Sequence, residues 1–181
     1  MNITVFGGSF PKEGSSAYSE GYELGRLLGE AGHSVITGGY IGTMEAVSKG
    51  ASEAGGHVIG VTCREIERWR GTAANPWVKE ERKFDTLSQR LDGLINGCDA
   101  AFALPGGPGT LTEISLMWNL MIVDAIHRRP LILIGQGWKS TFDQAYQELP
   151  EYFIDGQKSL IKFTTDVYQA VNLLENQFKF I

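Results

Sequence analysis

The sequence contains few of the residues that build disulfides and metal sites. Its 181 residues include only 2 cysteines and 3 histidines. Cys63 and Cys98 form no Cys-x-x-Cys pair, and the histidines are scattered, so no zinc-binding spacing is present. We therefore predict a protein without a bound metal or cofactor, and its free thiols indicate a reducing cytoplasm.

Long hydrophobic runs and clusters of positive charge are also missing. No segment approaches the roughly 18 apolar residues that a membrane-spanning helix needs. The N-terminal stretch has no basic region before its short apolar run, which is not typical of a signal peptide. The 21 acidic residues outnumber the 16 Lys and Arg residues, and the formal net charge is −5 at pH 7. Phosphate neutralisation drives nucleic-acid binding, so this acidic chain is not expected to bind a nucleic acid. Because no long apolar run is present, we do not expect a membrane as partner either.

Short apolar runs alternate with longer amphipathic segments along the chain. Strands are predicted over residues 3–6, 33–37, 57–62, 99–104, 130–134 and 160–163. Helices are predicted over residues 16–31, 43–54, 85–96, 111–126, 141–147 and 166–177. Residues 64–84 show no clear period, and we predict a loop or lid there. The alternation favours a single α/β domain over residues 1–181, with a Rossmann-like, doubly wound parallel sheet in a three-layer α/β/α arrangement.

Glycine is abundant, with 23 residues, and three glycine pairs follow predicted strands. The pairs are Gly7-Gly8, Gly38-Gly39 and Gly106-Gly107, and a predicted helix comes after each. Tight turns alone would explain one such pair. Three pairs at the carboxyl edge of one sheet favour a phosphate-binding site, because glycine lets the backbone approach a ligand and a helix N-terminus attracts an anion. The Walker A and GxGxxG patterns are both missing, so a mononucleotide fits better than a dinucleotide.

Residues 105–113 read PGGPGTLTE and resemble the PGGxGTxxE signature of the lonely guy family. This family comprises the cytokinin riboside 5'-monophosphate phosphoribohydrolases, also described as lysine decarboxylase-like proteins. The resemblance extends to residues 37–44 and 55–61, which are similar to the family's GGGxxGLM and GGxVIGV segments. Arg90 stands nine residues before Asp99, as the arginine of the family's MxxRK helix stands before its SDAF strand.

Several residues differ from the family pattern. Leu87 and Leu91 stand where the family has Met and Lys, and Glu45 stands where it often has Gly. These differences suggest a side branch of the family. The broader superfamily also includes similar proteins that resemble molybdenum-cofactor carriers.

The resemblance implies hydrolysis of the N-glycosidic bond of a nucleoside 5'-monophosphate, AMP or an N6-substituted AMP, to the free base and ribose 5-phosphate. It assigns Glu113 as the catalytic carboxylate and Arg90 as its partner. The residues expected to bind the phosphate and line the pocket are Gly8, Ser9, Gly38, Gly39, Gly42, Thr43, Gly106, Gly107, Gly109 and Thr110. The alternative function is a non-catalytic nucleotide or molybdenum-cofactor carrier that uses the same cradle. Lysine decarboxylation is excluded, because no motif for a lysine bound to pyridoxal phosphate is present.

Both catalytic candidates also have a purely structural interpretation. Thr110 and Glu113 have the spacing of a capping box, in which Glu113 would only bond the start of a helix. Arg90 borders an apolar stripe, from which its side chain would extend to the surface.

Residues 111–126 are apolar around nearly the whole predicted helix, which indicates burial on all sides. The sheet covers one side, so a second subunit would cover the other, and the resemblance also implies homodimers. Burial within one subunit is the alternative.

Overall fold

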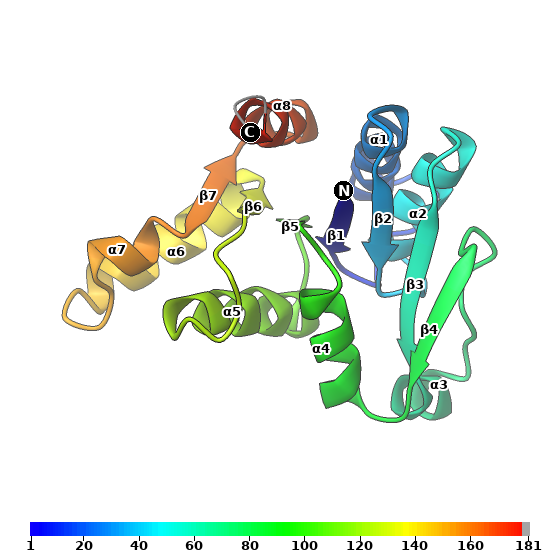
Figure 1. The fold of residues 1–181 in the computed structure, drawn as a ribbon, viewed down its shortest axis with the longest axis horizontal. Coiled ribbons are helices and arrows are strands. Elements are labelled where there is room, and N and C mark those ends of the chain that lie inside the picture. Colours follow the sequence, from blue (N-terminus) through cyan, green and yellow to red (C-terminus); the bar gives the residue numbers. More distant parts are fainter. Residues whose placement is uncertain (179–181) are drawn as a thin grey trace.

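The computed structural model describes residues 1–178 and has the predicted three-layer α/β/α architecture (Figure 1). Its seven parallel strands form one sheet in the order β4-β3-β2-β1-β5-β6-β7. The strands are β1 (Asn2–Phe6), β2 (Ser34–Thr37), β3 (Val58–Cys63), β4 (Glu80–Phe84), β5 (Ala100–Ala103), β6 (Leu131–Ile134) and β7 (Ile161–Thr164). The helices are α1 (Ser16–Glu30), α2 (Thr43–Glu53), α3 (Arg64–Arg70), α4 (Leu87–Asn96), α5 (Pro108–Ile122), α6 (Gln136–Glu148), α7 (Asp155–Lys158) and α8 (Val167–Phe178). The strand order reverses beside β1, and a doubly wound sheet binds its ligand in the crevice at this point. The predicted domain of residues 1–181 also includes residues 179–181, which lie outside the described part.

Helices cover both faces of the sheet (Figure 1). Helices α1, α2 and α8 pack on one face, and α4, α5 and α6 pack on the other. The central strands therefore have two buried faces, and every residue of β5 and β6 is buried. This double burial explains why the sequence has continuous apolar runs there instead of an alternating pattern.

The prediction of a loop or lid over residues 64–84 is wrong, because this segment contains α3 and β4. Strand β4 reads EERKF and lies at the edge of the sheet, with β3 as its one neighbour. Its residues alternate between half-buried and exposed, so charged side chains are tolerated and also protect the edge. Helix α3 is equally rich in charge and ends at Gly71, which has a φ of 64°. A search for apolar periodicity misses both elements.

Several predicted helix boundaries also differ from the structure. Helix α5 begins at Pro108 instead of residue 111, because proline is well tolerated in a first turn, where its missing N–H has no intrahelical partner. It ends at Ile122 instead of residue 126. Helix α6 begins at Gln136 instead of residue 141, and the short α7 was not predicted. Within residues 1–178, none of the helices is long and apolar enough to cross a bilayer.

Helix α5 is buried on one side and exposed on the other. Ile114, Met117 and Met121 are fully buried, whereas Leu111 is 41% exposed and Val123, the residue directly after the helix, is 61% exposed. The predicted burial on all sides is therefore wrong for the single subunit. Leu116, Leu120 and Ile122 are partly buried and pack against the core of the same subunit, so Leu111 is the exposed large apolar residue within this helix.

Candidate functional site

A cavity of about 420 Å³ opens at the carboxyl edge of the sheet. The segments that follow β1, β2 and β5 all contribute to its wall, through Gly8, Tyr40 and Gly107 respectively. Helix α4 contributes Arg90, and helix α5 contributes Glu113. Strand ends that meet at one edge of a parallel sheet thus bring together residues that are far apart in the sequence.

The two predicted catalytic residues form a buried ion pair in this wall. Nη1 of Arg90 lies 3.6 Å from Oε1 of Glu113, and the two residues are only 5% and 7% exposed. Nε of Arg90 donates a hydrogen bond to the Val61 carbonyl at 2.8 Å, and Nη2 donates one to the Gly38 carbonyl at 3.3 Å. The guanidinium also lies 5.6 Å from the centre of the Tyr40 ring. These contacts hold its charge in one place beside the carboxylate.

Neither structural interpretation of these two residues fits the geometry. Arg90 points into the protein, although it lies on an amphipathic helix whose N-terminus is closed by a capping box between Thr86 and Gln89. The capping residue of α5 is Gly107, so Thr110 already lies within the helix and does not cap it. Glu113 is therefore free to interact with Arg90 and the cavity.

Burial raises the pKa of Glu113 from its ordinary 4.5 to about 7. The positive charge of Arg90 acts in the opposite direction. At 3.6 Å its contact is longer than an ordinary hydrogen bond, so it offsets only part of the effect of burial. The carboxyl group thus exchanges a proton near neutral pH, which is the range that suits acid–base catalysis.

Some of the predicted phosphate-binding residues line the cavity. These are Gly8, Ser9, Gly107, Gly109 and Thr110. Helix α5 has no side-chain hydrogen bond at its N-cap, and Pro108 occupies its first turn. The N–H groups of Gly109 and Thr110 belong to that turn and have no partner within the helix. They give the cavity a wall that favours an anion.

The other predicted phosphate-binding residues shape the turns, and in the described chain they do not line this cavity. They are Gly38, Gly39, Gly42, Thr43 and Gly106. A Cβ on Gly38 would lie 2.1 Å from Nη2 of Arg90, and a Cβ on Gly106 would lie 2.2 Å from Oγ1 of Thr110. Oγ1 of Thr43 donates a hydrogen bond at 3.0 Å to a carbonyl of the turn after β1. These residues allow the close packing that brings the cavity wall together.

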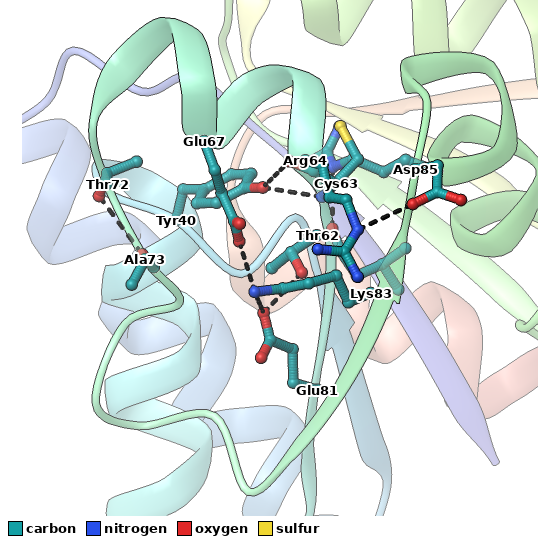
Figure 2. Close-up of polar contacts among 12 residues, drawn as sticks. Tyr40, Thr62, Cys63, Arg64, Glu67, Thr72, Ala73, Glu81, Lys83 and Asp85 are labelled. Atoms are coloured by element: carbon teal, nitrogen blue, oxygen red, sulfur yellow. Dashed lines mark hydrogen bonds and ion pairs between the residues drawn. The ribbon is translucent and has the colours of Figure 1, made fainter.

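Helix α3 forms another part of the cavity wall, and polar contacts fix it against the sheet (Figure 2). Oη of Tyr40 accepts a hydrogen bond from the Cys63 N–H at 2.8 Å and donates one to the Cys63 carbonyl at 3.0 Å. The Lys83 ammonium lies 3.0 Å from a carboxylate oxygen of Glu67 and 3.3 Å from one of Glu81. The Lys83–Glu67 pair ties α3 to β4, and the Tyr40 hydroxyl fixes Cys63, the residue directly before α3.

Sequence reasoning missed Phe10 and Arg70 at the mouth of the cavity, and it interpreted the third residue there, Trp69, as packing although stacking on a base was the alternative. Phe10 and Trp69 are 90% and 77% exposed, which is unusual for large aromatic side chains. Trp69 and Arg70 belong to α3, the helix that its charged sequence concealed. Phe10 follows the first glycine turn closely, and that position was the one available signal.

A second hollow of about 650 Å³ adjoins the cavity. The two share Ser9, Phe10, Trp69 and Arg70, and the second is also lined by Gly42 and Glu45. Within residues 1–178, no group of three or more His, Cys, Asp and Glu side chains could hold a metal ion.

Comparison with known proteins identifies the family. The model of the SLOG cluster4 family matches residues 1–154. This chain belongs to the SLOG cluster4 family. The SLOG chain is also 34% identical over 136 residues to the cytokinin riboside 5'-monophosphate phosphoribohydrolase LOG of Oryza sativa subsp. japonica. The match covers 74% of the SLOG chain and 54% of the rice protein, so the chain spans about half the length of the curated relatives it matches. The resemblance to the lonely guy family is thereby confirmed.

Solved structures share the whole fold of the SLOG protein. The molybdenum cofactor binding protein from Rippkaea orientalis superposes with a TM-score of 0.74 at 23% identity, covering 98% of this chain and 97% of that one. The molybdenum cofactor carrier protein MCP from Chlamydomonas reinhardtii gives a TM-score of 0.71 at 24% identity, covering 97% and 96% of the two chains. At these identities the likeness concerns the fold.

Proposed function

We propose that this SLOG protein hydrolyses the N-glycosidic bond of a nucleoside 5'-monophosphate, AMP or an N6-substituted AMP, to the free base and ribose 5-phosphate. The observation that carries the proposal is the buried pair of Arg90 and Glu113 in the wall of a cavity that also contains the N-terminus of α5. The pair offers a carboxylate for a sugar cation, and the helix N-terminus offers N–H donors for a phosphate. The cavity volume of about 420 Å³ is within the range of small-molecule sites.

In the proposed reaction, the phosphate binds to the N–H groups of Gly109 and Thr110, and the ribose lies beside Glu113. The bond between C1' and the base nitrogen breaks with its electron pair on the base, which leaves positive charge on the sugar. Ionised Glu113 stabilises this charge and accepts a proton from the attacking water, whose oxygen bonds to C1'. The departing base takes up a proton from solvent water, protonated Glu113 returns its proton to solvent, and the products are the free base and ribose 5-phosphate.

Arg90 acts as the positioning residue in this proposal. Its charge favours the ionised form of Glu113, which burial alone would disfavour. Its hydrogen bonds to the carbonyls of Val61 and Gly38 fix the guanidinium to β3 and to the turn after β2. Glu113 is thereby oriented without losing access to the cavity.

The test is release of the base from AMP, followed by chromatography of adenine and ribose 5-phosphate. We expect release by the unmodified protein and none by Glu113→Gln or Arg90→Ala variants that remain folded by circular dichroism. Failure to release a base from any common nucleoside 5'-monophosphate would remove the proposed activity. Full activity in either variant would refute the roles of the two residues.

The second candidate function is a non-catalytic carrier of a nucleotide or of the molybdenum cofactor. Leu91 and Glu45 favour it, because they differ from the lonely guy pattern and line the cavity and the adjoining hollow respectively. Retention of a ligand through purification, with Glu113→Ala leaving the affinity unchanged, would support a carrier. A large loss of affinity without any base release would contradict both candidates in their present form.

We further propose that the protein forms a homodimer in the cytoplasm. Helix α5 of one subunit would lie at the interface with α5 of the other. The exposed Leu111 on α5 and Val123 directly after it support this proposal, since both leave an apolar side chain at the surface. Light scattering on the purified protein tests it, and a monomer at micromolar concentration would contradict it.

A further inference from the structure

The cavity is lined by two arginines, and their charges are differently engaged. Arg90 is committed to Glu113 and to two backbone carbonyls. Arg70 is the last residue of α3 and lines both the cavity and the adjoining hollow. Within residues 1–178, it forms no ion pair with a carboxylate, and its polar contact is a hydrogen bond of 3.0 Å from Nη2 to Oγ of Ser9.

A phosphate monoester in this cavity needs more positive charge than the helix N-terminus provides. The ester carries between one and two negative charges near neutral pH, whereas the N-terminus of a helix is equivalent to about half of one positive charge. Glu113 in the wall and Glu13 and Glu45 in the adjoining hollow add negative charge to the surroundings, and Lys12 in that hollow adds one positive charge. An arginine side chain supplies a full charge and a planar fork of donors that matches phosphate oxygens.

We propose that Arg70 binds the phosphate of the ligand together with the N-terminus of α5. This inference rests on the proposed function for the class of ligand, a phosphate monoester such as a nucleoside 5'-monophosphate. The hydrogen bond to Ser9 directs the guanidinium toward the turn after β1, which lines the same cavity. The Trp69 ring, 5.1 Å from the guanidinium carbon, supports its other side.

The construction of α3 suits this role. Figure 2 shows the helix tied to β4 by the Lys83–Glu67 pair and to the residue after β4 by a bond of 2.8 Å from Arg64 to Asp85, while the Tyr40 hydroxyl holds Cys63, where β3 ends and α3 begins. Gly71 turns the chain with a positive φ of 64° directly after Arg70. The cation therefore stands at the end of a fixed helix, at the mouth of the cavity.

The test compares Arg70→Ala with the matched variant Arg68→Ala by isothermal titration calorimetry. Arg68 lies two residues earlier on α3 and lines a separate hollow with Arg64, Glu67 and Asp85. We expect Arg70→Ala to weaken binding of AMP and of ribose 5-phosphate by about tenfold or more, because a charge-assisted contact to phosphate is lost. Arg68→Ala should leave both dissociation constants unchanged. The dependence of affinity on salt should also become weaker in Arg70→Ala, and a purely structural role would not produce that change.

Arg70→Lys should recover part of the affinity, because it restores the charge without the fork of donors. An Arg70→Ala variant that binds both compounds as the unmodified protein does would overturn the proposal, and so would an equal loss in Arg68→Ala. Measuring base release beside ligand binding distinguishes a failure of this inference from a failure of the proposed function. Loss of binding in Arg70→Ala, with no hydrolysis by the unmodified protein, supports the phosphate contact and refutes the enzyme. Hydrolysis with an unchanged KM in Arg70→Ala supports the enzyme and overturns the contact.

Discussion

Replacing Glu113 by Gln makes the raised pKa of this carboxyl group measurable as a change in stability. The pKa is about 7 in the folded protein and 4.5 ordinarily, so the folded chain holds the proton more tightly than the unfolded chain. The contribution of the group to the free energy of unfolding is therefore complete below about pH 4.5 and is lost as the pH rises through about 7. Between about pH 5 and about pH 8, this loss amounts to about 2–3 kcal/mol.

Glutamine does not titrate, so the variant lacks this dependence on pH. The substitution also leaves the buried guanidinium of Arg90 without its carboxylate, which destabilises the fold. Arginine stays charged at both pH values, so this cost is the same at both and cancels in the comparison. The difference between the two proteins thus isolates the titration of Glu113.

Urea denaturation of both proteins at about pH 5 and about pH 8 provides the measurement. The stability advantage of the unmodified protein over Glu113→Gln should be larger at the lower pH by about 2–3 kcal/mol. Glu151→Gln, a substitution at an exposed position, controls for the loss of one negative charge. An advantage that is the same at both pH values would mean that Glu113 stays ionised throughout, and it would refute the dominance of burial over the Arg90 charge.

Three further outcomes test the site. The kcat/KM for AMP should rise as the pH increases through about 7, because the ionised carboxylate is the active form, and a flat profile over this range would contradict that role. Gly107→Val should fold normally, since a Cβ there meets no described atom within 4 Å, and it should bind nucleotide more weakly, since the side chain would enter the cavity that Gly107 lines. Gly106→Ala should lower the melting temperature, since its Cβ would lie 2.2 Å from Oγ1 of Thr110. Equal melting temperatures for these two variants, or unchanged affinity in Gly107→Val, would count against the geometry of the turn. Gly38→Ala should reduce kcat by roughly tenfold or more, the effect of disturbing one electrostatic contact. The new Cβ would lie 2.1 Å from Nη2 of Arg90, so the guanidinium has to move away from it. An unchanged kcat would show that Arg90 can move without consequence.

The order of strands and helices could be predicted from the sequence because most of the sheet is buried on both faces. The continuous apolar runs of β5 and β6, and the glycine pairs that end β1 and β2, mark the elements and the edge that binds a ligand. Helix α3 and strand β4 could not be predicted in the same way. Their stability depends on contacts with β3 and on ion pairs such as Lys83–Glu67, which leave no apolar period in the sequence.

The predicted site depended on motifs, and its geometry depended on tertiary contacts. Arg90 points inward because its partners come from three separate parts of the chain: Val61, Gly38 and Glu113. Spacing along the sequence contains no information about such a meeting. The same reason explains why Arg70 was missed, since its position at the cavity follows from where α3 packs.

A crystal structure of the protein with AMP tests the central claim most directly. We expect the phosphate at the N–H groups of Gly109 and Thr110, with C1' of the ribose beside the carboxylate of Glu113. A nucleotide bound outside this cavity, or one whose ribose lies away from Glu113, would contradict the account.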